Sequence, residues 1–92
     1  QIEEVLYRHA AVKEAIVIGI PDAYHGEMPK AFVTFNDGYV VEGDALKSWL
    51  NPQLGKHERV AAVEVRAELP KTLVGKLSRK ELVAGERAKA AA

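Results

Sequence analysis

The feature that most limits what this chain can fold into is its run of apolar residues from Ala15 to Ile20. The run is rich in β-branched side chains, contains no charged residue and is closed by Pro21-Asp22. A strand with one solvated face would alternate polar and apolar residues, whereas this run is continuous. β-Branched residues also favour the extended conformation. The run therefore predicts a strand that is buried on both faces.

The remaining segments predict two more strands and three helices. Ala31–Phe35 is a second apolar run, stopped by the turn residues of 36–38, and Val60–Val65 alternates loosely and predicts a third strand. Helices are predicted near the N-terminus, from Glu42 onward and after Ser78. Their signals are a helical apolar spacing or a capping box, at Ile2, Val5, Leu6 and His9, at Leu46, Trp49 and Leu50, and at Ser78-Arg79-Lys80-Glu81 followed by Leu82 and Val83.

The second helix carries two further predictions. Trp49 is the single tryptophan, and we expect it at the centre of the core. Asn51-Pro52 fits a helix cap followed by a first-turn proline, so we expect the helix to restart toward Leu54. The order helix, strand, strand, helix, strand, helix predicts an α+β fold, a small three-stranded β-sheet with helices packed against it.

The length of the chain, 92 residues, allows one domain over residues 1–92 with one modest core. Cysteine is absent, and His9, His25 and His57 are far apart without an acidic cluster, so we expect no disulfide and no bound metal. No apolar stretch approaches the roughly 20 residues of a membrane span, and no signal peptide is recognisable, which favours a cytoplasmic protein. The opening helical pattern without methionine is typical of a piece of a longer protein.

The net charge of zero hides an uneven distribution. Residues 71–92 carry six basic and two acidic side chains, so the rest of the chain is acidic by the same four charges. A basic tail suits an anionic ligand such as a nucleotide or the phosphates of coenzyme A, although a solvated helix face has the same composition. We expect no nucleic-acid partner, because no aromatic residue lies among these charges to stack on bases.

The most informative stretch for function runs from Leu69 to Leu82 and reads Leu-Pro-Lys-Thr-Leu-Val-Gly-Lys-Leu-Ser-Arg-Lys-Glu-Leu. It is not a phosphate-binding loop of the form G-x-x-x-x-G-K-[ST], because Pro70 takes the first glycine position and Leu77 the hydroxyl position. A solvated basic face is one interpretation. The Pro-Lys-Thr lead, the Gly-Lys pair and the Arg79/Leu82 spacing occur together, which favours a motif that presents Lys76 to a ligand.

This stretch resembles the last signature of the adenylate-forming superfamily, roughly P-K-T-x-x-G-K-x-x-R-x-x-L. The similarity to the C-terminal small domain of acyl- and aryl-CoA synthetases covers nearly the whole chain, through Ile2–Leu6, Val12–Ala15, Gly19–Asp22, Gly26-Glu27 and Ala31–Val33. The resemblance implies part of an AMP-forming acid:CoA ligase whose substrates are ATP and coenzyme A. It also implies a hinge before Gln1 and a large N-terminal domain of the same polypeptide, which binds ATP, Mg²⁺ and the acid. The chain alone is then expected to be inactive.

By the same resemblance Lys76 is the catalytic residue of acyl-adenylate formation. Joining a carboxylate to the α-phosphate of ATP brings two anions together, and an ammonium that touches both lowers the barrier. Gly75 is expected to let the backbone approach the ligand. The domain then rotates and builds part of the coenzyme A thiol channel. Residues matched to nucleotide contacts of some aryl ligases are Tyr24, His57 and Arg59.

Several alternatives stay open. The chain could belong to an adenylation domain that loads a carrier protein, or to a non-catalytic module that binds an anion or an acidic partner. Acylation of Lys76 would remove its charge, so a lysine acetyltransferase and deacetylase are candidate partners. Glu27 and Lys30 are expected to fix their loop. The sequence departs from the family pattern at His57, where an aromatic residue is common, and at Val60, where proline is usual.

Overall fold

The computed structural model describes residues 2–22, 24, 26–56 and 58–91. The predicted element order is confirmed, with one short 3-10 helix added. The elements are α1 (Ile2–Tyr7), β1 (Val12–Asp22), β2 (Gly26–Phe35), α2 (Gly43–Leu50), the 3-10 helix η1 (Asn51–Gln53), β3 (Ala62–Val65) and α3 (Arg79–Ala91).

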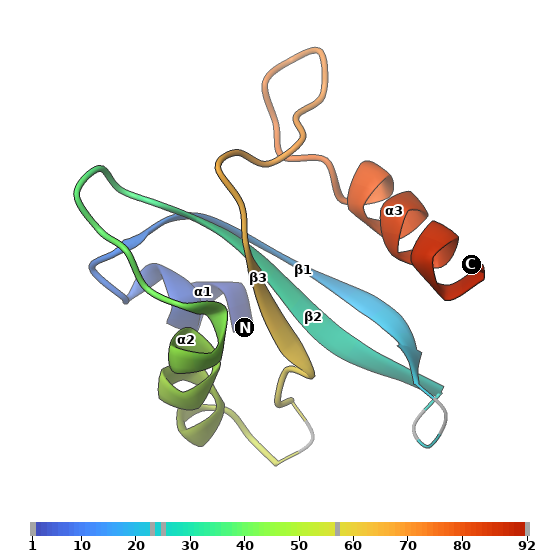
Figure 1. The fold of residues 1–92 in the computed structure, drawn as a ribbon, viewed down its shortest axis with the longest axis horizontal. Coiled ribbons are helices and arrows are strands. Elements are labelled where there is room, and N and C mark those ends of the chain that lie inside the picture. The colour runs from blue at the N-terminus through green and yellow to red at the C-terminus, as the bar shows by residue number, and fades with distance from the viewer. Residues whose placement is uncertain (1, 23, 25, 57, 92) are drawn as a thin grey trace.

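The three strands form one mixed sheet in the order β1-β2-β3, with β2 in the centre (Figure 1). β1 and β2 form a long antiparallel hairpin in which Ile16 lies opposite Phe32. β3 joins β2 in parallel, and the intervening chain crosses over through α2. Because strand residues alternate between faces, this register divides the apolar residues of the hairpin between two sides of the sheet.

Each face of the sheet has its own apolar cluster, which confirms that the first strand is buried on both faces. Ala15, Ala31 and Val33 pack with Leu6 of α1 and Leu46 of α2 on one side, among other residues. On the other side Ile16, Ile18 and Phe32 pack with Leu82 of α3 and with Leu69. Figure 1 shows the same division, with α1 and α2 close together and α3 apart from them.

The prediction for Trp49 is wrong, because this side chain is only partly buried and lies at the margin of the first cluster. Its ring meets the His9 ring edge-on, with 4.8 Å between the centroids. Leu46 and Leu50 of the same helix are fully buried. Residues four apart share a helix face, and Trp49 lies beside that face, so the two leucines face the sheet. The largest fully buried side chain is Phe32 of β2.

The prediction for Asn51-Pro52 is confirmed in part. A helix restarts directly after α2 as the 3-10 helix η1, with Pro52 in its first turn, but Asn51 is not its cap, because the N-cap is Leu50 and makes no side-chain hydrogen bond. The Asn51 amide instead accepts from the Val60 N–H at 2.9 Å and donates to the Val60 carbonyl at 3.2 Å. Val60 thus pairs with a side chain rather than with β2, which explains why β3 begins at Ala62 and not at the predicted Val60.

Candidate functional site

The segment that carries Lys76 is a small hairpin between β3 and α3. Lys71 and Leu77 form an antiparallel bridge at its base. The Gly75 N–H donates to the Thr72 carbonyl at 2.9 Å, and the Thr72 N–H donates to the Lys76 carbonyl at 2.7 Å. These bonds are typical of a tight turn followed by a one-residue bulge at a left-handed glycine. In Figure 1 the hairpin is the orange loop that projects beyond the sheet.

Gly75 is required by this turn for a backbone reason. Its φ is +83°, in the left-handed region that side chains with a Cβ rarely adopt. A Cβ at this position would meet no atom within 4 Å, so space is not the constraint. The expected role of Gly75 in approaching a ligand stays a prediction.

The hairpin holds the backbone of Lys76 and leaves its side chain exposed. The Lys76 N–H donates to the Thr72 hydroxyl at 3.3 Å, and its carbonyl accepts from Thr72. Within the described ranges, no carboxylate lies within ion-pair distance of the Lys76 ammonium. Leu73 and Val74 at the tip are also exposed. The Lys76 side chain is therefore exposed, while hydrogen bonds within the hairpin fix the Lys76 backbone.

Two basic residues of the motif anchor the base of the hairpin. The Lys71 ammonium lies 3.1 Å from the carboxylate of Glu14 on β1. The Arg79 guanidinium lies 2.6 Å from the carboxylate of Glu3 on α1. Buried Leu69 precedes the hairpin and packs in the same cluster as Leu82 of α3. The hairpin is thus fixed to two elements of the domain body.

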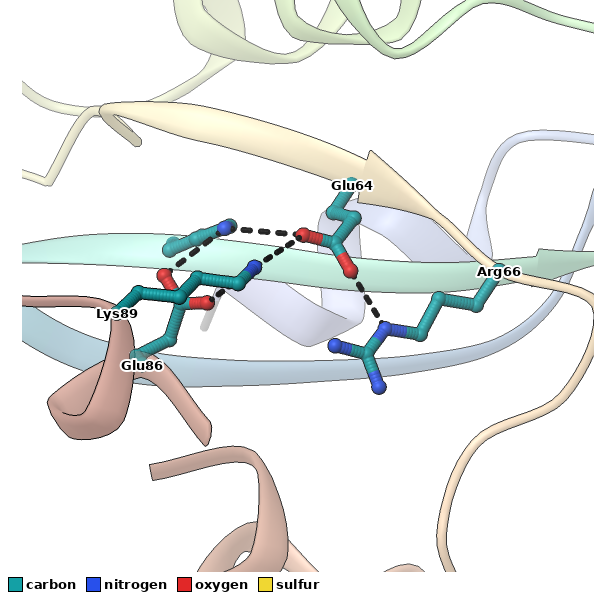
Figure 2. Close-up of polar contacts among 5 residues, drawn as sticks. Glu64, Arg66, Glu86 and Lys89 are labelled. Atoms are coloured by element: carbon teal, nitrogen blue, oxygen red, sulfur yellow. Dashed lines mark hydrogen bonds and ion pairs between the residues drawn. The ribbon is translucent and has the colours of Figure 1, made fainter. Parts of the chain in front are cut away.

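A polar network holds α3 against the sheet (Figure 2). The Lys30 ammonium of β2 lies 3.1 Å from Glu64 and 2.9 Å from Glu86. Lys89 of α3 contacts the same two carboxylates, and Arg66 binds Glu64 at 2.6 Å. We expected Lys30 to fix its own loop. The structure gives it a different role, because Lys30 joins the central strand to β3 and α3.

The network lowers the pKa values of its carboxylates. Burial opposes ionisation of Glu64, but the hydrogen bonds from Arg66 and Lys30 outweigh burial and lower its pKa to about 2. The hydrogen bond from Lys30 likewise holds the pKa of Glu86 below its ordinary value, against the opposing effect of burial. Both carboxylates therefore stay ionised at neutral pH and keep their ion pairs.

The basic tail is largely paired with the acidic body. Of its six basic residues, Lys71, Arg79 and Lys89 contact Glu14, Glu3 and Glu64 respectively. Half of the predicted anion-binding charge is thus used inside the domain. Sequence reasoning missed these partners, because no spacing in the sequence links residues such as Glu3 and Arg79, which lie 76 positions apart.

Two of the three residues predicted to contact coenzyme A, Tyr24 and Arg59, belong to segments away from the Lys76 hairpin. Tyr24 is exposed and lies between β1 and β2 in the chain. The end of β1 and the start of β2 lie at the end of the sheet opposite the hairpin (Figure 1). Arg59 precedes β3 and lines an open hollow of about 400 Å³ with five residues of α2 and η1, namely Asp44, Lys47, Ser48, Asn51 and Pro52. Tyr24 does not line this hollow. His57 lies outside the described residues.

Glu27 has a packing role beside the same turn. A Cβ on Gly19 would collide with the Glu27 side chain, so Gly19 leaves the space in which that side chain sits. In the described part of the chain, no group of three His, Asp or Glu side chains is arranged to hold a metal ion. The described helices include none that is both long and apolar enough to cross a bilayer.

Comparison with known proteins assigns the family. A profile described as AMP-binding enzyme C-terminal domain matches residues 1–76. The chain is 41% identical over 86 residues to a long-chain-fatty-acid–CoA ligase of Bacillus subtilis strain 168, and 36% identical over 89 residues to an acetyl-coenzyme A synthetase of Deinococcus radiodurans. Each match covers 94% of this chain, but only 15% and 14% of the two relatives.

The solved structures agree with the sequence relatives. The crystal structure of an acyl-CoA synthetase from Brucella canis matches with a TM-score of 0.85 and 36% identity, over 97% of this chain and 17% of that chain. A three-stranded mixed sheet between helices, followed by a projecting glycine-lysine hairpin, is thus the fold of the C-terminal domain of an adenylate-forming enzyme. The chain belongs to the AMP-binding enzyme C-terminal domain family.

Proposed function

We propose that the chain is the mobile C-terminal domain of an ATP-dependent, AMP-forming carboxylic acid:CoA ligase, and that Lys76 stabilises the adenylation transition state. The observation that supports the proposal is that the Lys76 side chain is exposed and, among the described residues, has no carboxylate within ion-pair distance. Its neighbours in the motif, Lys71 and Arg79, are paired with carboxylates, whereas Lys76 extends from a glycine turn into solvent. A cation kept available in this way suits an anionic ligand.

The chemistry explains why a lysine serves at this position. A carboxylate oxygen attacks the α-phosphorus of ATP, the new oxygen–phosphorus bond forms, and pyrophosphate leaves with the electrons of the broken bond. Negative charge is concentrated around phosphorus during this step. A lysine ammonium that bridges the carboxylate and the α-phosphate offsets that charge without changing the substrates covalently. The large domain of the same polypeptide would hold ATP, Mg²⁺ and the acid.

A second surface of the domain would serve thioester formation. Arg59 and Lys47 place two cations beside one carboxylate at the hollow next to η1, which suits the phosphates of coenzyme A. Tyr24 offers an exposed ring for stacking on adenine. Both positions lie away from Lys76, so one domain could serve the two half-reactions only by turning a different face to the active site.

The experiment that tests the proposal compares Lys76→Ala with wild type in a full-length ligase that contains this domain. We expect pyrophosphate release to fall by about 100-fold or more, because one charge-stabilising group is lost. Thioester formation from synthetic acyl-adenylate and coenzyme A should change less than about twofold. Lys80→Ala is the matched control, because Lys80 is an exposed lysine of the same motif. An unchanged adenylation rate in Lys76→Ala would contradict the proposal.

Two alternatives remain. One is an enzyme that passes the acyl group to a carrier protein, and the other is a binding module that forms no acyl-adenylate. A carrier-loading enzyme would need the same lysine but would pass its acyl-adenylate to a tethered thiol rather than to free coenzyme A. A binding module would tolerate Lys76→Arg and would lose its partner steeply as salt rises. The acid substrate stays open, because the chain is similar to ligases named for both long-chain fatty acids and acetate.

Regulation by acylation is part of the same proposal. Lys76 is exposed on a projecting hairpin, so a lysine acetyltransferase could reach its amine. Acetylation removes the charge that adenylation requires. Full-length enzyme acetylated at Lys76 should therefore lose adenylation as Lys76→Ala does, and a deacetylase should restore it.

A further inference from the structure

Three elements that are distant in sequence meet at the carboxylate of Glu3. Its Oε2 atom accepts from the Val17 N–H of β1 at 2.9 Å and binds Nη2 of Arg79 at 2.6 Å. The Nε atom of Arg79 also donates to the Val17 carbonyl at 3.5 Å. Arg79 therefore binds a carboxylate and a strand carbonyl at the same point. We call these three residues the Glu3 clasp.

The Glu3 clasp lies at the base of the limb that carries Lys76. Arg79 is the first residue of α3 and follows Lys76 by three positions. The other limb has its own anchor, the ion pair between Lys71 and Glu14. Between Lys76 and α3, Leu77 forms the bridge with Lys71 and packs against the second apolar cluster, and the Ser78 N–H donates to the Pro70 carbonyl. Arg79 adds a directional polar link between the Lys76 limb and the domain body.

We infer that Arg79 is a positioning residue for adenylation, which acts by fixing the Lys76 hairpin to α1 and β1 through Glu3. The inference rests on the proposed role of Lys76. The Arg79 side chain is 59% exposed and that of Glu3 is 27% exposed, so the pair contributes little to global stability. The pair matters because it fixes the position of the Lys76 hairpin. A small misplacement of a catalytic group reduces the reaction rate far more than it reduces the stability of the fold.

The test measures both half-reactions in a full-length ligase that contains this domain, for Arg79→Ala, Lys76→Ala and the double variant. Arg79→Ala should slow adenylation by roughly 10- to 100-fold, with an unchanged KM for ATP. Thioester formation from synthetic acyl-adenylate should stay within about twofold of wild type, as should both steps in the control Lys80→Ala. Because Arg79 acts through Lys76, the double variant should be no slower than Lys76→Ala alone.

Glu3→Gln tests the same clasp from the other side. The amide oxygen can still accept from the Val17 N–H, but the charge that holds Arg79 is removed. A smaller loss, confined to adenylation and with an unchanged melting temperature, is expected. This variant keeps the test decisive if Arg79→Ala fails to fold.

Four results would overturn the inference. Arg79→Ala with normal adenylation, while Lys76→Ala is defective, would remove the positioning role and leave the proposed function standing. Multiplied losses in the double variant would mean that Arg79 acts on the substrates directly. An equal fall in both half-reactions together with the melting temperature would make Arg79 a residue of general stability. Normal adenylation in Lys76→Ala would remove the proposed function and the inference with it.

Discussion

At the scale of single residues, Gly75 and Gly85 show that the same amino acid can be needed at one position and costly at another. Gly75 has a φ of +83° in the turn before Lys76. Gly85 lies inside α3, and a Cβ there would also meet nothing within 4 Å. Space is therefore equal at the two sites, and the backbone conformation alone distinguishes them.

This contrast predicts opposite effects of one substitution in the 92-residue chain. Gly75→Ala should lower the free energy of unfolding by about 1–2 kcal/mol, because alanine is strained in the left-handed region. Gly85→Ala should raise it by about 0.5–1 kcal/mol, because alanine favours the helix interior. Urea unfolding followed by circular dichroism measures both. Equal stability of Gly75→Ala and wild type would show that the turn relaxes to another conformation.

At the scale of elements, the position of α3 depends on buried apolar contacts and on the network of Figure 2. Leu82 inserts among Ile16, Ile18 and Phe32 and supplies the apolar part. Glu86 and Lys89 on the same helix bind Lys30 and Glu64. Lys30 and Arg66 also lie over the Phe32 ring, at 5.0 and 4.9 Å from its centroid. The charged network thus covers one edge of the second apolar cluster.

The network predicts a specific acid sensitivity. The pKa of Glu64 is lowered from 4.5 to about 2 in the folded chain, so the unfolded chain binds its proton first. The stability that Glu64 contributes is complete above about pH 4.5 and is lost as the pH falls toward 2. The urea midpoint should therefore decrease over this window. Glu64→Gln should have a lower midpoint at neutral pH and a flatter profile below pH 4.5; an unchanged slope would contradict the assignment to Glu64.

At the scale of the whole molecule, the two candidate sites are at opposite ends of the sheet. The Lys76 hairpin projects from one end, and the end of β1 and the start of β2, which flank Tyr24 in the chain, lie at the other (Figure 1). Arg59 lines its hollow with residues of α2 and η1, which pack on the face of the sheet away from α3. A single static approach to an active site could not bring both ends to the same reacting atoms.

This separation predicts independent effects in a full-length ligase. Arg59→Ala should raise the KM for coenzyme A about tenfold, the loss expected when one charge-assisted hydrogen bond is removed, and leave adenylation unchanged. Combined with Lys76→Ala, the two defects should add in free energy, since the sites share no partner. Lys56→Ala, a nearby exposed lysine that does not line the hollow, is the control. An adenylation defect in Arg59→Ala would contradict this division of roles.

Much of the architecture follows from the sequence because its signals are local. The apolar run at Ala15–Ile20 requires cover on both faces, and spacing and turn residues define the remaining elements in the right order. The boundaries of β3 and the place of Trp49 were predicted wrongly for the same physical reason. Each depends on a contact that no local spacing reveals, namely the Asn51 side chain for Val60 and the sheet for the face of α2.

The candidate site divides in the same way. The motif around Lys76 is contiguous, so the sequence by itself determined the family and the residue to test. Only the tertiary structure decided which basic side chains are available. Lys71, Arg79 and Lys89 are paired with carboxylates that lie between 3 and 76 positions away, while Lys76 extends beyond their reach. Ion pairing depends on distance in space, and the fold sets that distance.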